Sequence, residues 1–143
     1  MTGIFAPSLP RPALHAQVIP AGAGLLAAAL VTDLLYCRTF SSQWETFSIW
    51  LLMAGLIVAA VSGLALLWDL ALHRVARVSW PRFSALMAAA LLSLLNAFIH
   101  SRDGYTAVAP IGLALSGAVV LILVVVGAGG WNLNRAPDPG GLQ

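Results

Sequence analysis

The chain has very few charged residues and almost no cysteine. Only 8% of its 143 residues are charged, and all seven basic residues are arginine, so lysine is absent. Soluble domains carry about 25% charged residues, and a surface this poor in charge could not coat a soluble domain of this size. The single cysteine, Cys37, excludes an internal disulfide, and without a C-x-x-C-H segment no c-type haem can be attached. These shortages exclude an ordinary soluble domain and point to lipid as the solvent.

Motifs of the common enzyme classes are missing as well. The sequence contains no nucleophile elbow, no phosphate-binding glycine loop, no H-E-x-x-H and no metal ligands at the usual spacings. Its net charge of +2 comes from arginines in short segments beside apolar runs, where membrane insertion explains them. We therefore expect no catalytic residues, no metal site and no nucleic-acid binding, although the sequence does not decide whether the chain has an activity of its own.

Long apolar runs fill most of the chain, in which 60% of the residues are hydrophobic. They predict helices at about residues 18–37, 47–72, 83–100 and 107–131, between flexible tails at 1–13 and 136–143. Each run is long enough to cross a hydrocarbon layer of about 30 Å at a rise of about 1.5 Å per residue. Short connections make neighbouring helices antiparallel. The predicted fold is an all-α integral membrane protein, a single four-helix bundle with up-down-up-down topology.

The arginines predict how this bundle is oriented. Those on the side of the two termini are Arg11, Arg74, Arg77, Arg82 and Arg135, and those on the far side are Arg38 and Arg102. Because positively charged loops stay in the cytoplasm, both termini are expected to be cytoplasmic. The use of arginine alone, with abundant alanine, is typical of a GC-rich bacterial genome. We therefore expect a multi-pass protein of the bacterial inner membrane.

Small residues recur at helical spacing in all four predicted helices and indicate which faces meet, because close backbone approach drives helix association in lipid. The predicted faces are Gly24, Ala28 and Thr32; Gly55, Ala59 and Gly63; Ala85, Ala89, Ser93 and Ala97; and Gly112 and Ser116. A chain this rich in alanine and glycine also produces such pairs by chance. Chance recurrence is the alternative to true packing faces.

Polar residues near the far side form the first candidate site. Asn96 and His100 share a helical face, Asp33 lies at the same depth in the first helix, and Arg102 follows just beyond. An ion pair between Asp33 and Arg102, or a hydrogen bond between Asp33 and Asn96, would be chemically reasonable. One interpretation is a proton or quinone site, and the other is a latch that fixes helix packing.

The second candidate site lies on the terminal side and contains His15, Asp69 and His73. Asp69 and His73 are four residues apart on one face, and His15 precedes the first helix at the same level. One hypothesis is that the two histidines ligate a b-type haem or, with Asp69, a metal ion. The alternative is a set of interfacial polar residues, in which Asp69 pairs with His73 or Arg74. A haem usually takes histidines from within helices, which favours the alternative.

Several segments, read together, resemble one bacterial membrane family. They are His15, residues 32–35, residues 44–56, Gly63, Asp69, Asn96, and residues 102–104, 110–116 and 129–130. In order and spacing they are similar to the family catalogued as domain of unknown function 2231. The resemblance implies a four-helix inner-membrane protein whose relatives associate with redox modules. The chain departs from the pattern at Ala16, where a proline is expected, and at Ser84, where a histidine is expected. Both departures weaken the haem hypothesis.

Together, the residues and the resemblance predict a membrane anchor or small subunit of a periplasm-facing electron-transfer complex. Its expected partners are the lipid bilayer and a redox protein, such as a dehydrogenase, a cytochrome or a Rieske-type protein, and it could form oligomers. The competing hypothesis is a stand-alone membrane protein that binds a small ligand or quinone, or relays protons, through Asp33, Asn96 and His100. A purely structural subunit is the third.

Overall fold

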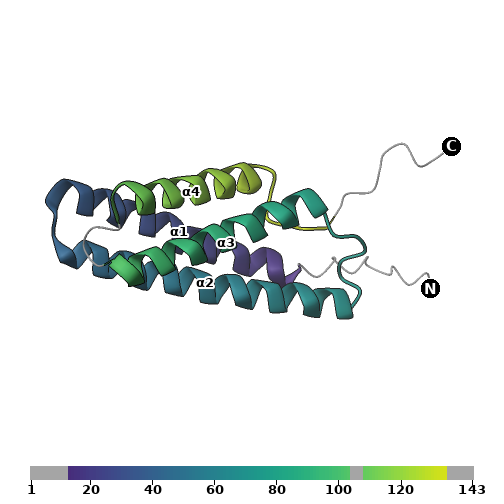
Figure 1. Cartoon of the computed structure of the whole chain (residues 1–143). Helices are drawn as coiled ribbons and strands as arrows, with labels where there is room; N and C mark the ends of the chain where they lie inside the picture. The colour runs from purple at the N-terminus through teal and green to yellow at the C-terminus, as the bar shows by residue number, and fades with distance from the viewer. Residues whose placement is uncertain (1–12, 104–107, 135–143) are drawn as a thin grey trace, which may run out of the picture.

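The computed structural model describes residues 13–103 and 108–134, and it is a bundle of long helices. In chain order these are α1 (Leu14–Thr39), α2 (Ser42–Ala71), α3 (Trp80–Asp103), a π-helical turn (Val108–Gly112) and α4 (Leu113–Ala128). Four helical segments are long and apolar enough to cross a membrane. The chain is therefore an all-α membrane protein of four helices, as the sequence predicts (Figure 1).

The helix ends follow local backbone chemistry. Phe40 adopts the left-handed conformation, with φ of 52°, and its N–H donates to the Tyr36 carbonyl at 2.7 Å, which ends α1 and turns the chain directly into α2. At its other end α1 begins at Leu14, ahead of the predicted start at residue 18. Pro20 consequently lies inside the helix rather than near its start. A proline is tolerated there because neighbouring helices support a membrane-spanning backbone.

The α1–α2 turn and the chain's two ends mark opposite ends of the bundle. We call the first the hairpin end and the second, where α1 begins and α4 finishes, the terminal end (Figure 1). At the terminal end, the segment after α4 pairs with the α2–α3 connection. The Ser79 N–H donates to the Leu133 carbonyl at 2.8 Å, and Val78 forms an isolated antiparallel bridge with Asn134.

Helices α1 and α2 pack closely at Gly22 and Gly55. A Cβ added to Gly55 would lie 2.6 Å from Cδ2 of Leu26 and 3.6 Å from the Gly22 carbonyl oxygen. The space beside Gly55 is therefore filled by the Leu26 side chain, which would have to move to admit a larger residue. Of the predicted small-residue faces, that of α3 is buried at Ala89, Ser93 and Ala97.

Two predicted faces are only partly right. Gly24 and Gly63 are exposed, whereas their neighbours Gly22 and Ser62 are buried. The buried faces of α1 and α2 are therefore displaced around the helix from those that the glycine spacing predicts.

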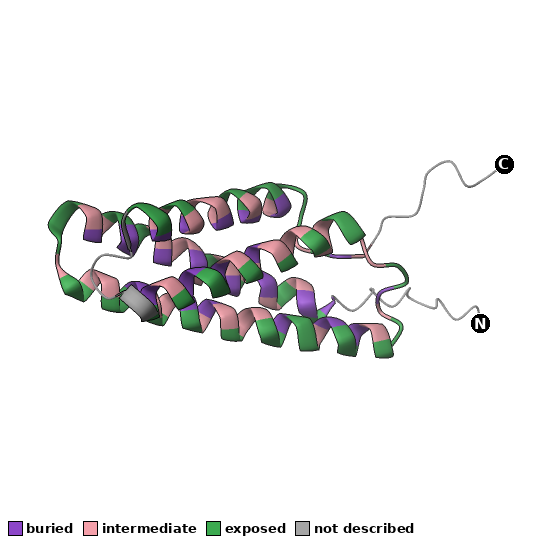
Figure 2. Cartoon of the chain, in the orientation of Figure 1, coloured by how far each residue is buried: buried purple, intermediate pink, exposed green. Residues whose placement is uncertain are grey.

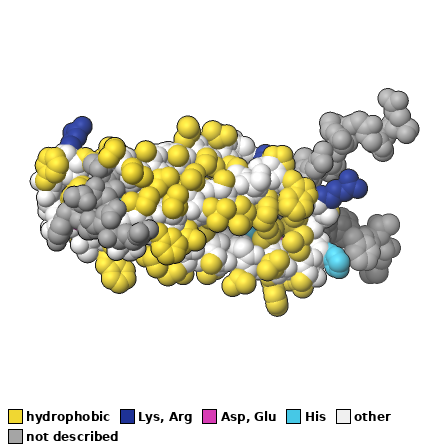
Figure 3. Space-filling view, in the orientation of Figure 1, with side chains coloured by type: hydrophobic (Ala, Val, Ile, Leu, Met, Phe, Trp, Pro, Cys, Tyr) yellow, Lys and Arg dark blue, Asp and Glu magenta, His cyan; other side chains and the backbone are white. Residues whose placement is uncertain are grey.

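The bundle buries polar side chains and exposes apolar ones. Large exposed hydrophobic side chains cover the outside, among them Trp50, Ile57 and Val125, while ten of the described polar or charged residues are buried. Figure 2 shows the buried positions on the helix faces that point inward, and Figure 3 shows hydrophobic side chains over the middle of the molecule. Lipid takes the role that water plays for a soluble protein, so the exposed apolar side chains are solvated. Function is then sought among the buried polar groups.

Candidate functional site

A group of five buried polar residues joins all four helices near the hairpin end. We call it the four-helix cluster, and it consists of Asp33 in α1, Ser48 in α2, Asn96 and His100 in α3, and Ser116 in α4. The first three are fully buried, and the exposure of the others does not exceed 5%. Each helix thus contributes at least one polar side chain at the same depth.

Asp33 is the acceptor at the centre of this cluster. Its Oδ1 accepts a hydrogen bond from the Ser48 hydroxyl at 2.5 Å, and its Oδ2 accepts one from the Ser116 hydroxyl at 2.6 Å. The Asn96 amide donates to the Ser116 oxygen at 2.8 Å. Ser116 therefore accepts from α3 and donates to α1, which makes one continuous chain of hydrogen bonds across three helices.

His100 completes the cluster but is not fully hydrogen-bonded. Its Nδ1 donates to the Asn96 carbonyl oxygen at 3.0 Å, which fixes the hydrogen on that nitrogen. Its Nε2 lies 3.5 Å from Asp33 Oδ1, within reach of an ion pair but without hydrogen-bond geometry. The Asn96 Oδ1 is also buried without a hydrogen-bond partner in the described part of the chain. The cluster thus combines one carboxylate with two polar atoms that have no hydrogen bond.

A second buried group, which we call the His15–Asp69 cluster, lies at the terminal end. Asp69 Oδ2 accepts from both the backbone N–H of His15, at 3.0 Å, and the ring Nδ1, at 2.8 Å. The other ring nitrogen, Nε2, accepts from the backbone N–H of Leu133 at 3.1 Å. Because Nε2 accepts, the hydrogen of the neutral ring must lie on Nδ1, where it faces the carboxylate. Arg74 lies 3.4 Å from the remaining oxygen of Asp69.

The structure brings together most, but not all, of the residues that the sequence singles out. Asp33, Asn96 and His100 lie in one cluster, although Ser116 bridges Asp33 and Asn96, which make no direct bond. The side chain of Arg102 lies outside the part of the chain that the structure describes, and so does its predicted ion pair with Asp33.

At the terminal end His15 and Asp69 are in contact, whereas His73 is exposed in the turn after α2, with φ of 54°. Arg74, which the sequence offered as an alternative partner of Asp69, lies beside it.

The sequence does not identify Ser48 as a partner of Asp33, or the backbone N–H of Leu133 as a partner of His15. Ser48 lies in a run of aromatic and aliphatic residues, where its helical depth opposite Asp33 was the only available signal. Ser116 was assigned to a packing face, not to a hydrogen bond. No sequence pattern announces the Leu133 N–H, because every residue except proline has one and the fold alone brings this one to His15.

Neither cluster offers a ready set of metal ligands. No group of three or more His, Cys, Asp or Glu side chains that could hold a metal ion occurs within residues 13–103 and 108–134. For a haem iron, His15 would have to release the Leu133 N–H, and His73 would have to leave its exposed position. In the structure both ring nitrogens of His15 are hydrogen-bonded, and His73 is exposed.

The chain belongs to a family of membrane proteins. The family model described as predicted membrane protein (DUF2231) matches residues 11–136, which is most of the chain. This finding agrees with the resemblance carried by the sequence segments. Searches of curated proteins and of solved structures gave no match.

Proposed function

We propose that this protein is a non-catalytic anchor subunit of the bacterial inner membrane that holds a periplasm-facing redox protein at the bilayer. In this proposal the electron-transfer chemistry belongs to the partner, a dehydrogenase, a cytochrome or a Rieske-type protein, and the chain itself carries no cofactor. The observation that carries the proposal is the α1–α2 turn, which lies beyond the nearest ends of α3 and α4 (Figure 1).

The projecting turn has the composition of a contact surface. Helix α2 has 30 residues, a length of about 45 Å against a hydrocarbon layer of about 30 Å. Phe40 is 78% exposed at its tip, Arg38 and Gln43 are exposed beside it, and the Trp44 and Phe47 rings lie 6.0 Å apart. Aromatic and arginine side chains are enriched in protein interfaces. They also suit the headgroup layer, so a direct test is needed.

The same proposal requires the hairpin end to face the periplasm. Among the described arginines, the terminal end carries Arg74, Arg77 and Arg82 and the hairpin end carries Arg38, which supports cytoplasmic termini. We expect a periplasm-active reporter to work when inserted at Gln43 and to fail when fused after Gln143. The reverse pattern would overturn both the orientation and the docking surface.

Site-specific crosslinking tests the anchor. A photoreactive amino acid at Gln43 should crosslink, in intact cells, to a protein that carries a haem, an iron–sulfur cluster or a quinone cofactor, whereas the same probe at Arg77 should not. An absorption spectrum of the purified chain should show no Soret band, and the purified complex should show the spectrum of the partner. A Soret band from the chain alone, or crosslinks to the redox protein only from Arg77, would contradict the proposal.

One observation favours a second candidate, a proton-binding site at the four-helix cluster. Nε2 of His100 and Oδ1 of Asp33 both carry lone pairs when the ring is neutral and the carboxylate is ionised, so their 3.5 Å approach is favourable only when the pair holds a further proton. Infrared difference spectra of wild type and Asp33→Asn, recorded across a pH titration, should then show a carboxyl or imidazolium band that the variant loses. A titration without such a difference would exclude this candidate.

A further inference from the structure

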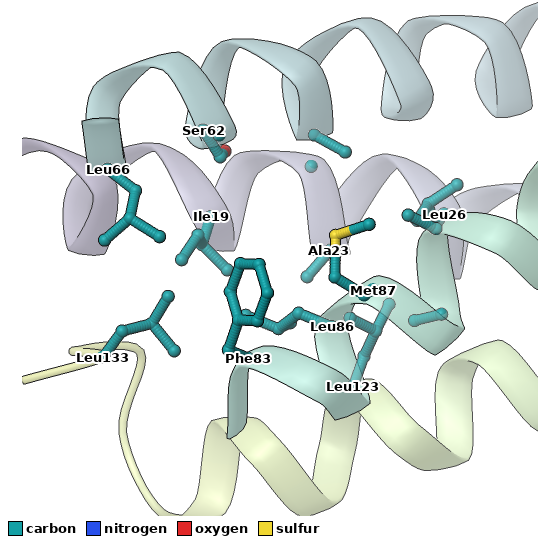
Figure 4. Close-up of a pocket in the computed structure, with 15 residues that line it drawn as sticks. Ile19, Ala23, Leu26, Ser62, Leu66, Phe83, Leu86, Met87, Leu123 and Leu133 are labelled. Atoms are coloured by element: carbon teal, nitrogen blue, oxygen red, sulfur yellow. The ribbon is translucent and has the colours of Figure 1, made fainter. Parts of the chain in front are cut away.

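An apolar cavity lies inside the bundle on the side where α2 and α3 face each other. Its volume is about 100 Å³ (Figure 4). Ile19 from α1, Ser62 and Leu66 from α2, Phe83 and Met87 from α3, and Leu133 from the segment after α4 line it. Apolar cavities of about 150 Å³ stay dry and accept small hydrocarbons, so a space of this size takes several carbon atoms.

The cavity opens toward the lipid between α2 and α3. These two helices pack against each other far less than α1 and α2 do. Gly63 on α2 and Met87 on α3 both line the cavity and are exposed, so they lie on the two sides of its opening. A Cβ added at Gly63 would meet no atom within 4 Å, so there is open space on that side of the opening. All of the lining residues from α1 to α4 belong to candidate membrane spans, so the substance outside the opening is hydrocarbon.

Three arginines lie on segments that adjoin the lining residues of the cavity at the terminal end. The α2–α3 connection crosses this end and carries Arg74 and Arg77, and Arg82 directly precedes the lining residue Phe83. Arg77 is exposed, Arg74 is partly exposed beside Asp69, and Arg82 donates to the Asn132 carbonyl at 3.0 Å. Arginine guanidinium groups bind phosphate through paired N–H donors.

The described charge at this end is positive, because Arg74, Arg77 and Arg82 outnumber its one carboxylate, Asp69. Asp69 is fully buried and accepts from His15, with Arg74 beside it. The other carboxylates of the described side chains, Asp33 and Glu45, belong to the hairpin end. Figure 3 shows arginine and histidine side chains at the terminal end of the face drawn and an apolar surface toward the middle of the molecule. A basic rim over an apolar cleft between helices is complementary to an anionic lipid.

We propose that this cavity binds one acyl chain of an anionic phospholipid, whose phosphate lies against Arg77 and Arg82. The chain enters between Gly63 and Met87 and fills the apolar space, and the remainder of the lipid lies along the surfaces of α2 and α3. A neutral phospholipid supplies the same hydrocarbon but leaves the excess arginine charge unmatched, so it binds more weakly. The site is independent of the proposed anchor function, because it lies at the opposite end from the projecting turn.

Native mass spectrometry of the full chain, released from detergent with added lipid, tests this site. Phosphatidylglycerol should be retained about fivefold more than phosphatidylcholine with the same acyl chains, since one arginine near the surface contributes a factor of this order. Arg77→Gln should remove most of that preference. Arg38→Gln, at the hairpin end, should leave it unchanged and so serves as the charge control.

Variants that fill the cavity test where the acyl chain lies. Gly63→Leu should lower the retention of both lipids severalfold, because the new side chain occupies the space of the acyl chain. Gly24→Leu is the matched control, since Gly24 also has no atom within 4 Å of an added Cβ but lies outside the cavity lining. If Gly63→Leu fails to fold, Ala90→Leu fills the same space from α3.

Several results would overturn the proposal. They are equal retention of the two phospholipids by wild type, unchanged retention in both filling variants, and displacement of phosphatidylglycerol by equimolar isoprenoid quinone. The last result would assign the cavity to a quinone. None of these outcomes bears on whether Gln43 contacts a periplasmic protein, so failure of this proposal and failure of the anchor are distinguishable.

Discussion

The four-helix cluster and the His15–Asp69 cluster each place one carboxylate in the bundle interior, but they recruit different kinds of partner. Asp33 is held by hydroxyl groups of serine side chains on other helices. Asp69 is held by a backbone N–H and by a histidine ring whose second nitrogen accepts from the chain beyond α4. The first cluster ties side chains of the four helices together near the hairpin end, and the second ties the start of α1 and the segment after α4 to the bundle.

This difference decides what happens when a carboxylate is removed. Serine hydroxyls in this bundle can fall back on their own helix, as Ser62 and Ser93 do by donating to carbonyls four residues earlier. The backbone N–H of His15 has no such alternative, because it belongs to the first turn of α1, where no earlier carbonyl of the helix is available. The His15–Asp69 cluster should therefore tolerate the loss of its carboxylate less well than the four-helix cluster does.

The largest expected effect follows from substituting leucine for each aspartate in turn. Asp69→Leu should lower the free energy of unfolding by about 2–3 kcal/mol, because it leaves two buried donors of His15 unsatisfied. Asp33→Leu should cost about 1–2 kcal/mol, since Ser48 and Ser116 can turn to their own helices. Reversible unfolding in mixed micelles, followed by tryptophan fluorescence, measures both. An equal or larger loss for Asp33→Leu would reverse the comparison.

A second prediction concerns the packing of α1 against α2, the two helices that contribute to both clusters. Gly55→Ala should lower the free energy of unfolding by about 1–3 kcal/mol, because the new Cβ overpacks the Leu26 side chain, which can make room only by moving or by pushing the two helices apart. The new Cβ would lie 2.6 Å from the Leu26 side chain. The separation should weaken the bonds of both carboxylates, since Ser48–Asp33 and His15–Asp69 each join α1 to α2.

The matched control for this change is Gly63→Ala, on the same helix and equally part of the predicted small-residue face. Its added Cβ meets nothing within 4 Å, so unfolding should be unaffected or slightly more difficult. The same micelle titration applies to both variants. Similar losses at the two glycines would mean that the close contact at Gly55 does not explain the cost of its substitution.

Sequence reasoning reached the fold because hydrocarbon permits few structures. A backbone in lipid must satisfy its own hydrogen bonds, so apolar runs of sufficient length predict helices, and short connections predict their order. The depth of Asp33, Asn96 and His100 also follows from counting residues along helices, and the structure places the three together.

The sequence does not predict how each helix is rotated about its own axis. Gly22 and Gly24 could each allow another helix to approach closely. Gly22 is the one that faces α2, where it meets the side chain of Val58 and the backbone of Gly55. Ser116 as a bridge depends on the same rotations. The hydrogen bond from the Leu133 N–H to His15 depends on the path of the chain after α4, which hydrophobic periodicity does not predict.

The smallest expected effect tests whether the hydrogen-bond chain through Ser116 stabilises the four-helix cluster. Ser116→Ala removes the acceptor of Asn96 and one donor to Asp33, and it should lower the free energy of unfolding by about 1 kcal/mol. Ser93→Ala is the control, because the Ser93 hydroxyl is fully buried yet donates only to the Ala89 carbonyl of its own helix, at 2.8 Å. Ser93→Ala should lower the free energy of unfolding by less than about 0.5 kcal/mol.

A double-mutant cycle then separates the contact from the residue. Combining Ser116→Ala with Asn96→Leu should cost less than the sum of the two single losses, because both changes remove the same hydrogen bond. The same cycle between Ser93→Ala and Asn96→Leu should be additive, since Ser93 and Asn96 share no bond. Full additivity for the Ser116 pair would mean that the four helices associate at this depth by packing alone, and that the polar side chains are only accommodated there.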